Sequence, residues 1–231
     1  GRPLVLTLSS YIMPLALTAL CECVPGILTF LAIFEGVLSW SKNQMRQMDR
    51  YFAFLMINVF LVVTIGGAIV AVAEEIADHP REIFTLLGES LPTMSGFFFE
   101  YMMLRGVAGN AVTLVRAGAI AQTLFKSTFI PNLSRRNLIE PVVSLRAWSN
   151  PGWYSYGKSY GNLLLGLVVL LCYAPLAPMI LVCLVLYFGM TWFVTKYVYL
   201  YVFEYKFETG GAFFPRLYPR VFVCLALAQA T

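Results

Sequence analysis

Long hydrophobic runs alternate along this chain with shorter polar stretches. Most runs reach about 20 residues, the length that an α-helix needs to cross a bilayer. The stretch 159–195 is uncharged and too long for one crossing, so Pro175 and Pro178 are expected to divide it. The pattern predicts an all-α, polytopic transmembrane helix bundle, a single pore module over 1–231 with about six spans. The expected spans are 4–34, 51–73, 92–125, 160–174, 176–203 and an incomplete 221–231.

The composition agrees with a membrane protein. The chain is 59% hydrophobic and 12% charged, about half the charge of a soluble domain. Its basic residues do not gather with aromatic ones, so we expect membrane lipids and no nucleic acid as partners. The five cysteines all lie in apolar runs, where they are expected as buried small side chains rather than as disulfides or metal ligands.

The distribution of Lys and Arg predicts the orientation. The segments 36–50, 126–158 and 196–220 hold twelve basic residues, whereas the alternate segments hold two. Basic loops of membrane proteins stay on the cytoplasmic side. We therefore expect these three loops to be cytoplasmic and the acidic loop 74–91 to face the opposite side.

The stretch 92–125 is apolar enough to span a bilayer, yet it carries Glu100, Arg105 and Arg116. A charge near the middle of a spanning helix costs at least ~2.5–3.5 kcal/mol, so such residues usually face water or a partner. At 100° per residue, one face of this helix collects both arginines and four further residues. We predict that this face lines a conduction path: Phe98, Met102, Arg105, Gly109, Thr113 and Arg116.

Two polar residues in other spans are candidates for the same path. Glu22 lies within the first span and either faces the groove or pairs with a basic residue of a neighbouring helix. Asn58 lies within the second span and either makes a helix–helix hydrogen bond or contacts ions. We count both among the predicted pore-lining residues.

A gate and a hinge are expected within the same stretch. Phe97 and Phe98 are candidates for an apolar constriction that closes by dewetting, with ordinary packing as the alternative. Gly106 and Gly109 either form a hinge or allow a neighbouring helix to approach closely.

Patterns of enzymatic or metal chemistry are missing from the sequence. The acidic group Glu74, Glu75, Asp78, His79 and Glu82 lacks the spacing of a calcium loop, so a solvated loop is favoured over a divalent cation site. We find no nucleophile–base pair, zinc-protease motif or phosphate-binding glycine loop. No catalytic residue, cofactor or metal site is predicted, and the chain is not expected to be an enzyme.

Short sequence patches that match one known family follow one another in the same order along almost the whole chain. They include Phe34-Glu35-Gly36, Arg50-Tyr51-Phe52, Asn58-Val59-Phe60-Leu61, Glu89-Ser90-Leu91-Pro92, Tyr101-Met102-Met103-Leu104, Tyr173-Ala174-Pro175 and Phe207-Glu208-Thr209-Gly210-Gly211. In this order and spacing, the chain resembles the OSCA-type channels, which are calcium-permeable, osmosensitive, stress-gated cation channels related to the anoctamins and TMC proteins.

The resemblance implies a mechanosensitive cation channel that is gated by membrane tension and passes calcium, sodium and potassium. The chain would be the C-terminal pore module, without the earlier spans, a cytoplasmic domain and the last span. The resemblance also implies a monomer or homodimer with one pore per subunit, in the plasma membrane or an endomembrane. The pore would be walled by 4–34, 51–73, 92–125, the span that begins near 160, and one helix upstream.

Two residues depart from the family pattern. Thr113 stands where the family often has a carboxylate, and Arg105 adds a positive charge to the predicted wet face. Both weaken the attraction for cations, for which Glu22 is the nearest compensating acid. A phospholipid scramblase is the main alternative, because a polar groove open to the bilayer, with Glu22 and Arg105 contacting headgroups, would serve lipids as well as ions, and the resemblance implies a superfamily with both kinds. A secondary transporter would show inverted repeats, which we do not find, and a non-conducting scaffold is a further alternative.

Overall fold

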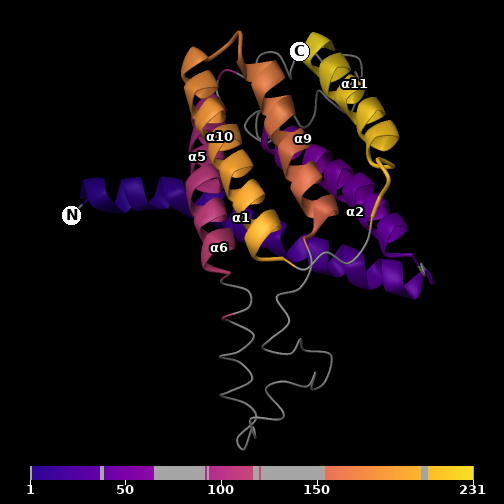
Figure 1. Ribbon diagram of the computed structural model, residues 1–231. Coiled ribbons are helices and arrows are strands. Elements are labelled where there is room, and N and C mark those ends of the chain that lie inside the picture. The colour runs from indigo at the N-terminus through magenta and orange to yellow at the C-terminus, as the bar shows by residue number, and fades with distance from the viewer. Residues whose placement is uncertain are drawn as a thin grey trace, which may run out of the picture.

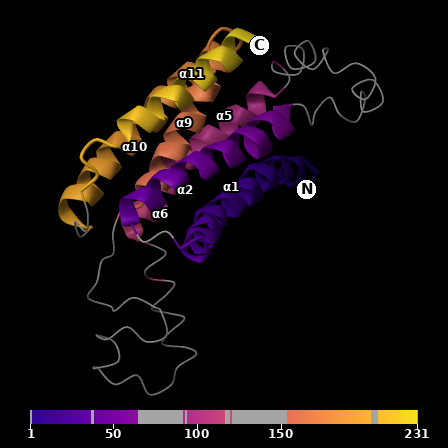
Figure 2. The ribbon, with the colours of Figure 1, turned by 90° about the vertical axis from the view of Figure 1, so that its right-hand side faces the viewer.

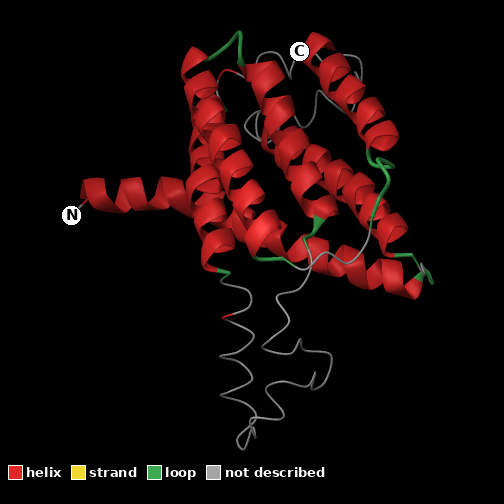
Figure 3. Ribbon diagram, viewed as in Figure 1, coloured by secondary structure: helices red, strands yellow, loops and turns green. Residues whose placement is uncertain are grey.

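The computed structural model describes residues 2–36, 39–64, 92, 94–116, 120, 154–203 and 208–230. Within these ranges the chain is helical and contains no strand, which confirms the all-α class (Figure 3). The α-helices are α1 (Arg2–Phe34), α2 (Trp40–Phe54), α5 (Ser95–Leu104), α6 (Asn110–Val115), α9 (Tyr156–Tyr173), α10 (Pro178–Tyr201) and α11 (Phe214–Ala230). Two π-helical segments, η1 (Leu55–Leu61) and η3 (Arg105–Gly109), continue α2 and α5.

Three helical stretches of the described chain are long and apolar enough to cross a membrane. They are Pro14–Ala32 within α1, Trp40–Thr64 along α2 and η1, and Pro178–Tyr201, which is α10. The chain is therefore a membrane helix bundle. The acidic segment 74–91 and most of the predicted loop 126–158 lie outside the described residues.

The described helices pack side by side around a main apolar core, and a smaller apolar cluster is formed by Met45, Met48 and Phe213 (Figure 1). Figure 2 shows α1 along one edge of the bundle, beside α2, with α10 and α11 on the opposite side. The core lies where α2–η1, α5 and α9 meet, and its largest side chains are fully buried. They include Tyr51, Phe60, Phe98, Tyr101, Leu165 and Tyr173.

Glycines bring α9 and α2 close together. A Cβ added at Gly157 would lie 2.7 Å from the backbone oxygen of Gln44, and one at Gly161 would lie 2.5 Å from Cδ1 of Tyr51. Both distances are too short for any larger residue. Small residues at a helix crossing let two backbones approach closely, as is common between membrane helices.

The proline at position 25 leaves one backbone carbonyl of α1 without its helical donor. Pro14 and Pro25 both lie inside α1, which bends visibly in Figure 2. Proline has no N–H, so the carbonyl four residues earlier, that of Cys21, loses its hydrogen bond. The hydroxyl of Tyr51 on α2 lies 3.2 Å from this carbonyl oxygen and is a donor available to it from outside the helix.

The predicted loop 36–50 is wrong over most of its length, because α2 begins at Trp40 and not at residue 51. Charge excluded these residues from the expected span, but in the fold the charges are paired. Arg46 and Arg50 reach Glu35 at the end of α1, with N–O distances of 3.2 and 2.6 Å. The uncharged polar side chains of this part, Asn43, Gln44 and Gln47, are buried against neighbouring helices.

The predicted loop 196–220 is also shorter in the structure. Residues 196–201 belong to α10, and 214–220 begin α11. The two arginines of this segment that the structure describes pair with Asp49 of α2: Arg216 at 3.2 Å and Arg220 at 2.8 Å. These ion pairs link the start of α11 to α2, while α11 packs mainly against α9.

The central helix is not a single helix through residue 125. It runs through α5, η3 and α6 and ends at Val115, where Arg116 adopts a left-handed conformation with φ of 55°. A bulky residue takes this conformation rarely and as a single residue, so it interrupts the helix.

Candidate functional site

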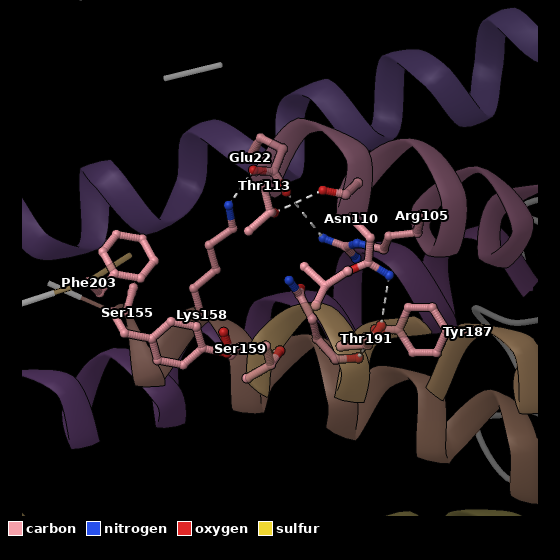
Figure 4. Close-up of a pocket in the computed structure, with 15 residues that line it drawn as sticks. Glu22, Arg105, Asn110, Thr113, Ser155, Lys158, Ser159, Tyr187, Thr191 and Phe203 are labelled. Atoms are coloured by element: carbon pink, nitrogen blue, oxygen red, sulfur yellow. Dashed lines mark hydrogen bonds and ion pairs between the residues drawn. The ribbon is translucent and has the colours of Figure 1, made fainter. Parts of the chain in front are cut away.

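A polar cavity of about 190 Å³ lies between α1, α9, α10 and the η3–α6 part of the central helix. Figure 4 shows its side chains converging from these elements. Hydroxyl groups of α9 and α10 contribute, including those of Ser159, Thr191 and Thr195. The charged and amide side chains that line it are Glu22, Arg105, Asn110, Lys158 and Asn162. A cavity with so many polar groups among apolar helices is suited to water or ions.

Arg105 forms the deepest charged part of this lining. Its side chain is 5% exposed, and its Nη1 donates to the Tyr101 hydroxyl at 2.5 Å. Its Nη2 donates to the Tyr51 hydroxyl at 3.2 Å. The guanidinium also lies over the Tyr101 ring, 5.4 Å from its centroid, a favourable cation–π distance. Arg105 is therefore held in one place by two tyrosines.

Glu22 connects two cations across the cavity. Its Oε2 pairs with Nζ of Lys158 on α9, and its Oε1 lies 4.0 Å from Nη2 of Arg105. The Glu22 side chain is 42% exposed. Glu22 thus lies in the cavity lining and is also ion-paired, and its role as a pore-lining residue stays a prediction. The described lining has two cations and one carboxylate.

Tyr51 joins three helices at one hydroxyl group. Besides Cys21 and Arg105, it lies 3.0 Å from Oδ1 of Asn162 on α9. A hydroxyl has one proton, so Tyr51 donates to Cys21 or to Asn162 while it accepts from Arg105. The position of the guanidinium therefore depends on contacts with both α1 and α9.

The π-helical segment η3 contains both predicted hinge glycines. A π-segment inserts an extra residue into an α-helix and is frequent at functional sites. A Cβ at Gly106 would lie 3.3 Å from Cα of Tyr187 on α10, so close packing is required there. At Gly109 the nearest atom is Cγ of Arg105 at 3.7 Å, which leaves room. Asn110, directly after η3, donates to the Gly106 carbonyl at 2.7 Å and to Thr191 Oγ1 at 3.1 Å.

The cavity brings together Glu22, Arg105, Gly109 and Thr113. Thr113 donates to the Gly109 carbonyl at 2.9 Å and is exposed. Glu22 was predicted from the first span, and the other three were predicted from the span 92–125. Their role in conduction stays a prediction.

The other predicted site residues lie elsewhere. Phe98 and Met102 are fully buried in the core, where the Phe98 ring contacts those of Phe60, Phe97 and Tyr173. Asn58 is exposed and donates to the carbonyl of Phe54 in its own helix. Arg116 follows the end of α6 and is not part of the described lining.

Several lining residues were missed at the level of sequence. Asn110, Asn162 and Thr191 are polar residues within otherwise apolar runs, which was a usable signal. Lys158 was counted only as a loop charge. Among the described residues, no group of three or more His, Cys, Asp or Glu side chains could hold a metal ion.

The fold and the cavity define a membrane helix bundle with a charged, polar interior site. A family model described as "calcium-dependent channel, 7TM region" matches residues 2–231. The CSC1-like protein ERD4 of Brassica juncea is 30% identical over 222 residues, which cover 96% of this chain and 30% of the relative. The hyperosmolality-gated Ca²⁺ permeable channel 3.1 of Arabidopsis thaliana is 30% identical over 224 residues, with the same shares. Channel 1.7 of that group and organism is 26% identical over 96% of this chain and 27% of the relative.

This chain belongs to the calcium-dependent channel family, which confirms the resemblance found in the sequence. The family is one of channels and not of enzymes. The chain spans 30% of the length of the first two relatives.

Proposed function

We propose that this chain is the pore-forming module of a calcium-permeable cation channel that membrane tension or osmotic stress opens. Membership of the channel family and the names of its relatives support this function. The observation that carries it is the cavity with charged and polar side chains that is bordered by α1, α9, α10 and η3–α6. Calcium, sodium and potassium are the proposed permeant ions.

The cavity is proposed as the cytoplasmic part of the path, because α9 begins beside it, after a predicted basic loop. Phe98 precedes Arg105 by seven residues, or about 10 Å along a helix. Between the two, Tyr101 and Met102 are also buried. This apolar layer is the proposed closed gate, and Phe97 and Phe98 are its outermost rings.

Opening is proposed to occur by movement of α6 about Gly106 and Gly109. The extra residue of η3 gives this part of the helix an irregular hydrogen-bond pattern, which supports bending there. α6 packs mainly against α10 among the described helices, whereas α9 is packed tightly between α2 and α11. A tense bilayer favours the conformation with the larger cross-section, in which α6 has moved outward.

Tension-clamped patch recording of the full-length protein tests this function. The expected result is a current that grows with applied tension and reverses at potentials set by calcium, sodium and potassium. A full-length protein that reaches the membrane and passes no such current under tension or hyperosmotic stress contradicts the proposal. One pore per subunit, in a monomer or homodimer of the plasma membrane or an endomembrane, is part of the same proposal.

A phospholipid scramblase is the second candidate. It is favoured by the exposure of Glu22 beside Lys158 and Arg105, since a headgroup carries both a phosphate and, commonly, an ammonium group. Translocation of fluorescent phospholipids in proteoliposomes, measured beside currents from the same preparation, separates the two functions. Lipid transfer without current supports the scramblase, and current without lipid transfer supports the channel.

A further inference from the structure

We infer that Arg105 is a specificity-determining residue, a fixed positive charge in the cavity wall that lowers permeability to calcium relative to potassium. The inference rests on the proposed channel function and concerns which ions pass, not whether ions pass. Three features of the described structure carry it: the burial of the guanidinium, its two hydrogen-bond partners, and the charge balance of the lining.

The charge of Arg105 is permanent and cannot move aside. An arginine side chain stays protonated in proteins. With 5% of its surface exposed and its two terminal nitrogens bound to Tyr101 and Tyr51, the guanidinium has little freedom to turn away from the cavity. A mobile surface lysine or arginine would be screened by water and salt, but a buried group is screened much less.

The neighbouring carboxylate does not cancel this charge. Glu22 makes its close ion pair with Lys158, and its other oxygen is 4.0 Å from Arg105. Arg105, Lys158 and Glu22 together leave one positive charge on the described lining. Coulomb energy is proportional to the product of the charges, so a divalent ion is opposed twice as strongly as a monovalent ion at the same position.

Tyr51 acts as a positioning residue in this arrangement. Its hydroxyl accepts from Arg105 and donates to the Cys21 carbonyl or to Asn162. It therefore sets where the positive charge stands relative to α1 and α9, the two helices that carry Glu22 and Lys158.

The test compares reversal potentials of full-length variants in tension-clamped patches, with calcium on one side and potassium on the other. Arg105→Gln removes the charge and is expected to raise the calcium-to-potassium permeability ratio by at least about threefold. Arg105→Lys keeps the charge and is expected to keep the ratio near that of the wild type. Arg46→Gln is the matched control. It removes the same positive charge, but Arg46 is exposed and pairs with Glu35 outside the cavity.

A second variant shifts the ratio in the opposite direction without touching the buried core. Glu22→Gln removes the carboxylate, so the ratio is expected to fall by at least about twofold. If Arg105→Gln gives no current, the calcium-to-potassium permeability ratio of Glu22→Gln decides whether the inference holds. An unchanged ratio in Glu22→Gln, or in Arg105→Gln with measurable current, overturns the inference while leaving the channel function intact. A wild-type protein without tension-dependent current instead contradicts the proposed function itself.

Discussion

The hydroxyl of Tyr51 lies 3.2 Å from the carbonyl oxygen of Cys21 on the neighbouring helix. Pro25 deprives that carbonyl of its own helical hydrogen bond, so a side chain of α2 completes the backbone of α1. The same hydroxyl accepts a hydrogen bond from Arg105. Helix packing and the charge of the cavity wall therefore depend on one phenol group.

Replacing Tyr51 by Phe removes these hydrogen bonds and keeps the ring. A buried carbonyl and a buried guanidinium then lose a partner, and we expect a loss of about 1–3 kcal/mol in the free energy of unfolding. Thermal unfolding of the full-length protein in detergent measures the change. Tyr197→Phe is the matched control, because Tyr197 is exposed on α10. Equal melting temperatures for the two variants would show that the Tyr51 hydroxyl contributes nothing.

Gly161→Ala tests the close approach of α9 and α2. The added methyl group would overlap the Tyr51 ring, so a loss of about 1–3 kcal/mol is expected from overpacking. Gly189→Ala in α10 places the same methyl group where no atom lies within 4 Å. That control is expected to be neutral or to stabilise by up to about 1 kcal/mol through helix propensity. Unfolding of both variants under one set of conditions gives the comparison.

Gly109→Ala separates flexibility from packing in η3. The methyl group would have ordinary contact with Arg105, so folding is expected to be preserved. A stiffer hinge should raise the tension needed for half-maximal current, which patch recording measures. Gly106→Ala provides the contrast, because its methyl group would press on the Tyr187 backbone and is expected to reduce stability as well. An unchanged tension threshold in Gly109→Ala would count against bending at this residue.

Phe98→Ala tests the proposed gate. The ring is fully buried among three other aromatic rings, so its removal is expected to cost about 3–5 kcal/mol of stability. If the apolar layer also closes the path, the surviving channels should leak at low tension. Phe222→Ala is the control, since Phe222 is exposed on α11. A destabilised protein without a leak would assign Phe98 to packing alone.

The ion pairs of Glu35 with Arg46 and Arg50, which join the end of α1 to α2, predict that stability depends on pH. Hydrogen bonds from Arg50, together with the charges of Arg50 and Arg46, lower the pKa of the Glu35 carboxyl from its ordinary value. A carboxyl with a lowered pKa stabilises the fold above its ordinary pKa of about 4.3 and stops doing so as the pH falls through the lowered value. The melting temperatures of the wild type and Glu35→Gln should therefore differ at pH 5 to 7 and converge as the pH falls below the lowered pKa. A constant difference over the whole range would contradict this role.

The sequence predicted the class of fold, and four of the residues predicted to line a pore lie in the cavity wall. Polar and charged residues are costly in apolar spans, and small residues there allow close approach, so such positions are candidates for a site. The cavity contains four of these candidates: Glu22, Arg105, Gly109 and Thr113. The start of α2 was missed because charge was taken as a sign of a loop. Arg46 and Arg50 instead pair with a carboxylate across the connection from α1.

The face predicted for the central helix borders the cavity from Arg105 to Thr113, but not in the turns before Arg105. The prediction assumed 100° per residue throughout, but η3 inserts a π-turn between Arg105 and Gly109. Before this segment, Phe98 and Met102 are buried in the core; Gly109 at its end, and Asn110 and Thr113 after it, border the cavity. A π-segment depends on tertiary packing, so periodicity alone does not locate it.

The hydrogen bond between α6 and α10 couples the position of α10 to the cavity wall. Asn110 binds Thr191 on the inner side of α10, while the outer side of that helix presents apolar residues such as Val185 and Trp192 to its surroundings. We expect acyl chains to press on this outer side, whereas the cavity wall is attached to the inner side through the Asn110–Thr191 hydrogen bond. A lipid composition that shifts α10 sideways is therefore expected to change the shape of the cavity without any ligand entering it.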